Sequence, residues 1–270
     1  MDVLKRNNVK VIGKGQTPML FAHGYGCDQN MWRYVYPAFE EEYKVVLFDH
    51  VGFGKADVSG YTPKKYGSLH AYAMDMLEII EALQLKDVIF VGHSVSAMIG
   101  VLAAIKKPNL FQKLVLVGPS PRYINDKGYI GGFERKDIDG LLQSLDSDYL
   151  SWAGAIAPVI MGNADRPELS DELATSFCSS NQEIAKNFAY LTFLSDNRQD
   201  LQKLKVPSLI IQCKEDVIAP LEVGEYMQKN TPESQMVVLE ATGHCPNLSA
   251  PEETVKTIQH FLATEKEAAK

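Results

Sequence analysis

The sequence lacks the features that mark membrane, secreted or nucleic-acid-binding proteins. No segment approaches the roughly 20 consecutive apolar residues of a membrane-spanning helix, and residues 1–10 are polar, without the apolar core of a signal peptide. Positive charge is also in deficit, because 27 Lys and Arg stand against 34 Asp and Glu and give a formal net charge of −7. These absences predict a cytoplasmic protein that binds neither membrane nor nucleic acid.

Cysteine is scarce, and no cofactor motif is present. The four cysteines lie far apart in the chain: Cys27, Cys178, Cys213 and Cys245. Without a C-x-x-C pair they are interpreted as reduced thiols rather than as disulfides or zinc ligands. Histidines and acids do not cluster at metal-ligand spacing, and the G-x-G strings at 13–15 and 52–54 are too short for the G-x-G-x-x-G of dinucleotide sites. We therefore expect no metal and no cofactor.

The order of apolar and helical segments predicts one α/β domain. A chain of 270 residues can bury a full-sized core without a second domain. Short runs that are apolar throughout alternate with helical patterns such as residues 68–83, which is typical of a mostly parallel sheet covered by helices on both faces. Residues 9–12 predict a short antiparallel edge strand. The predicted parallel strands are residues 19–22, 43–48, 87–91, 113–117, 208–213 and 236–239.

The alternation stops between Gly118 and about Asp196, where helical stretches are separated by Pro and Gly. A segment of this length is too long for a structureless loop in a compact domain, so we expect a helical lid over residues 119–196. Residues 1–118 and 197–270 then form the core. The predicted lid is rich in aromatic residues, some of which we expect to face a cavity.

Residues 88–100 read V-I-F-V-G-H-S-V-S-A-M-I-G and predict a nucleophile elbow. In such an elbow a strand turns sharply into a helix, and the strained turn exposes a serine above the sheet, here Ser94. Gly92 and Ser96 are the small neighbours that let the two backbones pass. The usual pattern is G-x-S-x-G, so Ser96 adds one hydroxyl where the helix crosses the strand.

A serine nucleophile needs a base and an orienting acid, and the chain supplies both in the order expected for this kind of site. His244 follows the last predicted strand in A-T-G-H-C-P, and Asp216 follows the preceding strand, at the edge where open α/β sheets place their active sites. Glu215 competes with Asp216 because one residue of register separates them. Cys245 could be mistaken for a nucleophile, but a small buried filler is the favoured interpretation.

Two backbone amides are predicted to stabilise the oxyanion that forms during acyl transfer. The amide of Val95 directly follows the serine. Tyr25, between two glycines in H-G-Y-G after an early strand, is the second predicted donor, and its ring is a candidate pocket wall.

Several motifs together resemble a known group of α/β-hydrolases. They are H-G-Y-G-C-D-Q at 23–29, V-G-H-S-V-S-A-M-I-G at 91–100, P-S-P-R-Y-I-N-D at 119–126, G-G-F-E at 131–134 and G-H-C-P at 243–246. The group includes the bacterial stress-signalling protein RsbQ and the plant strigolactone and karrikin receptors. The resemblance implies a four-helix lid over a deep apolar pocket, with the same triad and oxyanion donors. It also implies that the pocket is lined by Tyr25, Phe133, Trp152, Phe193 and Ile218.

Different motifs resemble different members of this group. C-D-Q, R-P-E, F-C-S and G-H-C-P look more like the bacterial protein, whereas S-V-S-A-M-I-G matches the plant receptors. We favour an RsbQ-like serine hydrolase that acts on a small apolar ester or lactone, in a signalling role that the resemblance implies, with a phosphatase-type regulatory partner. The alternatives are a ligand receptor with slow or no turnover that signals through a protein partner, a carbon–carbon bond hydrolase and a cofactor-free haloperoxidase. Tyr25 stands where many relatives carry phenylalanine.

Overall fold

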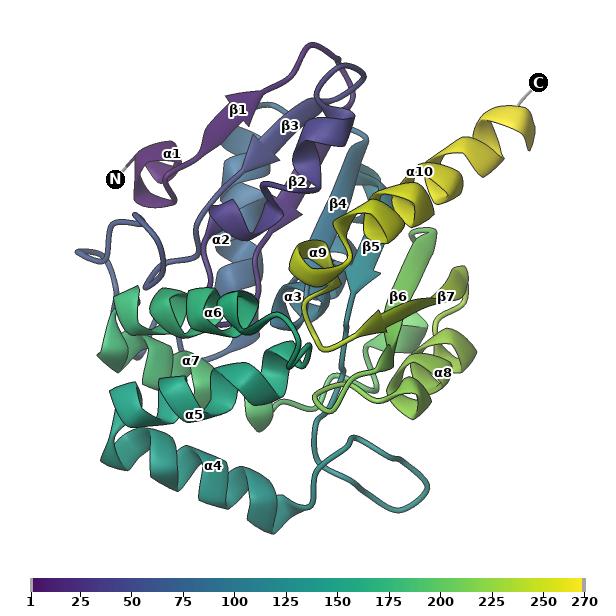
Figure 1. The fold of residues 1–270 in the computed structure, drawn as a ribbon. Helices are drawn as coiled ribbons and strands as arrows, with labels where there is room; N and C mark the ends of the chain where they lie inside the picture. Colours follow the sequence, from purple (N-terminus) through teal and green to yellow (C-terminus); the bar gives the residue numbers. More distant parts are fainter. Residues whose placement is uncertain (1, 269–270) are drawn as a thin grey trace.

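The structure is a computed structural model that describes residues 2–268, and it is built on one seven-stranded sheet (Figure 1). The strand order is β1-β3-β2-β4-β5-β6-β7; β1 runs antiparallel to β3 and all other pairs are parallel. This confirms the predicted mostly parallel sheet and its antiparallel edge. The strands are β1 (Lys10–Ile12), β2 (Pro18–Ala22), β3 (Lys44–Leu47), β4 (Val88–His93), β5 (Phe111–Val117), β6 (Ser208–Glu215) and β7 (Ser234–Thr242).

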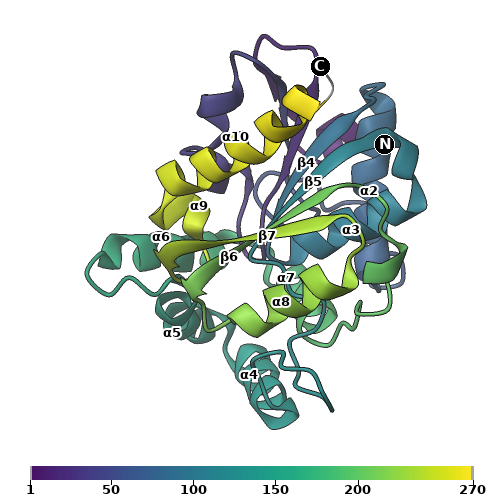
Figure 2. The same cartoon turned by 90° about the vertical axis from the view of Figure 1, so that its right-hand side faces the viewer.

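Helices cover both faces of the sheet. In Figure 2, α2, α3 and α8 lie on one side of the strands, and α9 and α10 lie on the other. The predicted helix over 68–83 is α2, and the last helix of the chain, α10, extends to Ala268. The helices outside residues 119–196 are α1 (Val3–Arg6), α2 (Leu69–Ala82), α3 (Val95–Lys106), α8 (Leu221–Asn230), α9 (Pro246–Ser249) and α10 (Pro251–Ala268), with short 3-10 turns η1 (Gln29–Trp32), η2 (Tyr36–Phe39), η3 (Pro108–Leu110) and η4 (Leu201–Lys203).

The central strands are apolar because helices pack on both of their faces. Every residue of β2 and β4 is buried, whereas β7, at the sheet edge, is partly exposed along most of its length. A strand covered on both sides has no solvent face, so it carries no alternation of polar and apolar residues. The carboxyl ends of these buried strands are therefore held rigidly, which suits them to position side chains.

Residues 119–196, called the insertion from here on, contain four helices and no strand longer than an isolated bridge. They are α4 (Arg135–Ser147), α5 (Tyr149–Met161), α6 (Pro167–Ser179) and α7 (Gln182–Phe193). In Figure 1 these helices lie together at the carboxyl end of the parallel strands. The insertion thus covers the sheet edge at which the predicted site residues follow their strands.

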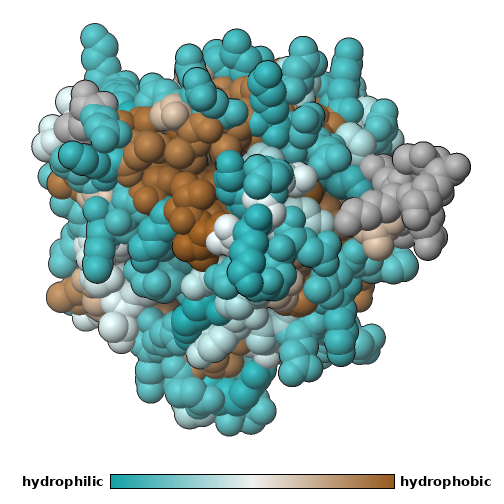
Figure 3. Space-filling model, turned by 90° about the horizontal axis from the view of Figure 1, so that it is seen from above, coloured by the Kyte–Doolittle hydropathy of each residue, from teal (hydrophilic) through white to brown (hydrophobic). Residues whose placement is uncertain are grey.

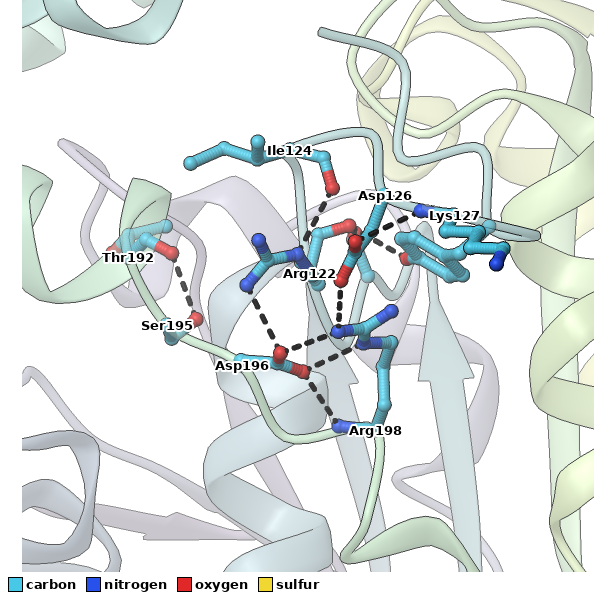
Figure 4. Close-up of polar contacts among 10 residues, drawn as sticks. Arg122, Ile124, Asp126, Lys127, Thr192, Ser195, Asp196 and Arg198 are labelled. Atoms are coloured by element: carbon cyan, nitrogen blue, oxygen red, sulfur yellow. Dashed lines mark hydrogen bonds and ion pairs between the residues drawn. The ribbon is translucent and has the colours of Figure 1, made fainter. Parts of the chain in front are cut away.

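The two ends of the insertion are joined by an ion-pair cluster, shown in Figure 4. Arg198 contacts Asp126 at 2.8 Å and Asp196 at 2.7 Å, and Arg122 contacts Asp196 at 2.9 Å. Hydrogen bonds from Arg198 lower the pKa of both carboxyl groups. The entering and leaving segments are also linked through the backbone, because the amide of Asn197 donates to the carbonyl of Pro121. The segments that enter and leave the insertion are therefore joined to each other at its base.

The end of the molecule away from the insertion is seen in Figure 3. Its surface is largely hydrophilic, with one continuous hydrophobic area. This area lies at the opposite end from the helices that cover the carboxyl ends of the strands, so it is separate from the candidate site. Among residues 2–268, no helix has the length and apolar composition needed to cross a membrane.

Candidate active site

Ser94 occupies a strained turn between β4 and α3, as the elbow motif predicts. Its backbone angles are φ 56° and ψ −124°, a region that favours glycine, and its amide donates to the carbonyl of Val117 at 2.8 Å. A strained non-glycine residue persists only where its surroundings enforce it. Gly92 permits the close crossing, because a Cβ there would lie 2.9 Å from the backbone carbon of Ser96 and 2.5 Å from the Phe90 ring.

Ser94, His244 and Asp216 come together in a buried line. His244 Nε2 lies 2.7 Å from Ser94 Oγ, and His244 Nδ1 lies 2.7 Å from Asp216 Oδ2. Because a carboxylate only accepts, Nδ1 carries the proton, which leaves Nε2 free to accept the hydrogen bond of the serine hydroxyl. Histidine in this tautomer can act as a general base toward Ser94.

The choice between Asp216 and Glu215 is decided by register. Asp216 is buried, and its Oδ1 accepts hydrogen bonds from the amides of Ile218 at 2.8 Å and Ala219 at 3.1 Å. Glu215, the last residue of β6, is exposed and lies near the Thr242 hydroxyl. The two amides and the imidazole fix the carboxylate of Asp216 in one orientation.

The loop that carries His244 is held by the core and by the insertion. The backbone amide of His244 donates to the carbonyl of Ile160 in α5 at 2.8 Å, and the backbone carbonyl of His244 accepts a hydrogen bond from Nε2 of His93 at 2.7 Å. Burial, with a contribution from His244, lowers the pKa of His93 to about 3. His93 is therefore neutral at physiological pH, and its hydrogen bond to the carbonyl of His244 supports the loop.

The two predicted oxyanion donors are available. Within residues 2–268, neither the amide of Tyr25 nor that of Val95 donates to a protein acceptor. Val95 is the first residue of α3, where backbone amides have no partner in the helix. Both amides are therefore free to donate to an oxyanion, as the two predicted donors must be.

A narrow cavity lies between the serine and the insertion. Its volume is about 30 Å³, room for one or two water molecules. This differs from the deep pocket that the resemblance implies, because aromatic rings nearly fill the space. The lining residues are Tyr25, Cys27, His93, Ser94, Tyr123, Leu141, Trp152, Ile156, Ile160, Leu173, Phe177, Thr192, Phe193, Ile218, His244 and Cys245.

Four of the five predicted pocket residues line this cavity, and Phe133 does not. Tyr25, Trp152, Phe193 and Ile218 are among the lining residues. Phe133 is instead partly buried near the start of the insertion, where it pairs with Ile124 in an isolated bridge. The prediction for Phe133 is wrong because this pairing keeps the residue at the joint of the insertion, away from the serine.

Some residues that line the cavity were not predicted from the sequence. Tyr123 and Phe177 line the cavity, and burial raises the pKa of Tyr123 to about 12. The many aromatic residues of the insertion were the available signal, but they did not indicate which rings face the cavity.

Cys27 and Cys245 also line the cavity. Burial raises the pKa of both thiols, that of Cys27 to about 12, so neither is a thiolate ready to act as a nucleophile.

His50, to which the sequence gives no role in the site, is fully buried beside the elbow. Its Nε2 lies 2.7 Å from the hydroxyl of Ser96, which in turn donates to the carbonyl of His23. The extra hydroxyl of the elbow therefore has two partners. No signal in the sequence relates these three positions, which lie on separate segments.

Within the described residues, no group of three or more His, Cys, Asp and Glu side chains is placed to hold a metal ion. The polar groups around Ser94 are instead arranged for proton transfer and for binding negative charge on oxygen.

Comparison with known proteins agrees with this arrangement. The model of the alpha/beta hydrolase family matches residues 19–257. The chain belongs to the alpha/beta hydrolase family. A solved hydrolase from Oleispira antarctica is 41% identical, with a TM-score of 0.94, and the match covers 96% of each chain.

Plant proteins of this family are also similar. A karrikin insensitive 2 receptor of Petunia hybrida is 38% identical over 96% of this chain and 97% of its own. A strigolactone esterase of Arabidopsis thaliana is 36% identical over 97% of this chain and 98% of its own. These relatives support the hydrolase and receptor group that the motifs indicate, but they do not support the narrower RsbQ-like assignment.

Proposed function

We propose that this alpha/beta hydrolase is a serine hydrolase that cleaves a small, largely apolar ester or lactone. The observation that carries the proposal is the line from Asp216 through His244 to Ser94, with both contacts at 2.7 Å. The substrate class follows from the side chains that line the cavity, most of which are apolar.

In the proposed reaction, Ser94 Oγ attacks the carbonyl carbon while His244 Nε2 takes its proton. The carbonyl oxygen becomes an oxyanion facing the amides of Tyr25 and Val95. When this intermediate collapses, the carbon–oxygen bond to the leaving alcohol breaks, and His244 gives its proton to that alcohol. An acyl group then remains on Ser94.

The second half repeats these steps with water. His244 removes a proton from a water molecule that attacks the acyl carbon, and the proton returns to Ser94 Oγ as the acid leaves. Asp216, in contact with Nδ1, orients the imidazole and stabilises the imidazolium that forms twice per cycle. In a lactone the alcohol stays tethered to the acyl group, so a hydroxy acid is released.

The test is the Ser94→Ala variant, assayed with short p-nitrophenyl esters and checked for folding by circular dichroism. We expect turnover to be abolished and the acyl adduct seen by mass spectrometry in the original protein to be missing from the variant. Unchanged turnover in a folded variant would rule the mechanism out. Assays with carbon–carbon bond substrates test the alternative of a carbon–carbon bond hydrolase, and assays with halide plus peroxide test that of a cofactor-free haloperoxidase.

A second candidate is a receptor that signals through a protein partner, with slow turnover or none. It is supported by the similarity to a protein named as a receptor and by the narrow cavity, which a ligand can enter only if side chains move. The RsbQ-like form of this candidate, with a phosphatase-type partner, rests on the sequence motifs. Pull-down of candidate regulators with and without a cavity ligand separates the two: ordinary esterase turnover with no partner favours the hydrolase.

A further inference from the structure

Two side-chain hydrogen bonds connect the insertion to residues 23–26, called the oxyanion loop from here on. The Tyr25 hydroxyl donates to the carbonyl of Ala185 in α7 at 3.1 Å. The Ser176 hydroxyl in α6 donates to the carbonyl of Gly26 at 2.8 Å. Two helices of the insertion thus hold two consecutive residues of a loop that belongs to the core.

Close packing accompanies these bonds. The ring of Tyr25 is parallel to that of Phe188 in α7, with 6.2 Å between centroids, and meets the ring of Phe177 in α6 edge-on at 5.5 Å. Gly26 has a φ of +68°, and a Cβ there would lie 2.1 Å from the Phe177 ring. Tyr25 and Gly26 are therefore packed directly against α6 and α7, with no space for a side chain at position 26.

The core also holds this part of the loop. The carbonyl of Gly24, in the peptide unit that carries the Tyr25 amide, accepts a hydrogen bond from Nδ1 of His23 at 2.8 Å and a longer one, of 3.4 Å, from the amide of Cys27. The amide of Gly24 donates to Met31 Sδ. Tyr25 has glycines on both sides, so its peptide unit is not restrained by neighbouring side chains. The orientation of the Tyr25 amide thus depends on the bond from His23 in the core and on the bonds that the insertion makes with the Tyr25 side chain and with Gly26.

We propose that Tyr25 and Ser176 are positioning residues through which the insertion holds the Tyr25 amide in place as an oxyanion donor. This inference rests on the proposed function. It means that the insertion is more than a cover for the cavity: when α6 and α7 shift, the oxyanion loop loses both bonds and the hydrolase loses one of its two donors. The position of the insertion then sets the rate of turnover.

The test uses Tyr25→Phe and Ser176→Ala, which remove one hydroxyl each and leave the backbone amides in place. Tyr190→Phe is the matched control, because the Tyr190 hydroxyl in α7 donates to Asp146 Oδ2 at 2.6 Å, within the insertion and away from the oxyanion loop. We expect each of the first two variants to lower kcat for p-nitrophenyl butyrate about fivefold, the effect of one lost hydrogen bond, with KM nearly unchanged. Binding of an alkyl boronic acid, which forms a tetrahedral adduct with serine, should weaken in parallel, and Tyr190→Phe should keep the original values.

Hydrogen exchange keeps this test distinct from that of the proposed function. If the unmodified protein shows no Ser94-dependent turnover, the proposed function fails, yet faster amide exchange in residues 23–27 of Tyr25→Phe and Ser176→Ala, but not of Tyr190→Phe, still demonstrates the connection. If the protein is an active esterase and both variants keep its kcat and its exchange rates, the proposed role of Tyr25 and Ser176 is overturned while the hydrolase assignment stands.

Discussion

The hydroxyl of Ser96, in the first turn of α3, donates a hydrogen bond to the backbone carbonyl of His23, the residue that begins the oxyanion loop. Nε2 of His50 lies 2.7 Å from the same hydroxyl. Because the Ser96 proton goes to the carbonyl, His50 donates from Nε2. The serine that replaces the usual glycine of the elbow therefore joins the elbow to the oxyanion loop from the core side.

Replacing Ser96 is expected to destabilise the protein. Ser96→Ala leaves the His23 carbonyl and the His50 Nε2 proton buried without partners, which costs about 1–3 kcal/mol. Ser96→Gly restores the usual elbow pattern but loses the same bonds and adds about 1 kcal/mol for glycine in a helix. Urea denaturation measures the free energy of unfolding of both variants. A variant Ser96→Ala as stable as the original would show that the two bonds contribute nothing to the free energy of unfolding.

The triad and the sheet could be predicted because their signals are local. Ser94, Asp216 and His244 each follow an apolar strand, and parallel strands bring their carboxyl ends to one edge of the sheet whatever the rest of the chain does.

The inner surface of the site could not be predicted in the same way. Which rings face the cavity depends on how four helices of the insertion pack on one another and on the core, and Phe133 was misplaced for this reason. The network of Ser96, His23 and His50 joins three separate segments. Such contacts appear only when the chain is folded, since no spacing in the sequence relates the residues.

Replacing the acid behind His244 tests the register of the triad. Asp216→Asn puts an amide where the Nδ1 proton of His244 is accepted, which favours the wrong tautomer, so we expect kcat to fall by about 10³ to 10⁴ with little change in KM. Glu215→Gln changes an exposed neighbour and should keep activity within twofold. Equal losses in the two variants, measured with the same ester, would mean that the carboxylate has been misassigned.

Widening the cavity is expected to change the preferred acyl length. Phe193 lines the cavity, whose volume is about 30 Å³, so Phe193→Leu should shift activity from acetyl toward butyryl and hexanoyl p-nitrophenyl esters. Phe133→Leu removes an aromatic ring from the joint of the insertion and should leave the order of chain lengths as it is in the original protein. The prediction fails if the two variants have the same chain-length profile.

The three buried histidines near the elbow predict that stability falls in mild acid. Burial lowers the pKa of His23, that of His93 to about 3, and that of His50 well below its usual value. In the unfolded chain these groups titrate near pH 6.5. Below that pH the unfolded state takes up protons that the native state does not, so their contribution, present above pH 6.5, is lost as pH falls, down to about pH 3 for His93.

For a histidine that stays neutral in the native state, as His93 does down to about pH 3, the free energy of unfolding should fall by up to about 1.4 kcal/mol per pH unit below pH 6.5. Urea denaturation at pH 7.5, 6 and 5 measures this slope. His93→Gln, whose side-chain amide can still donate to the His244 carbonyl, removes one of the three titrating groups and should make the slope shallower by that amount. The exposed His70 provides the control His70→Gln, which should have the slope of the original protein. Parallel curves for all three proteins would show that protonation of His93 is not linked to unfolding, and that its ring is already charged, or open to water, in the native state.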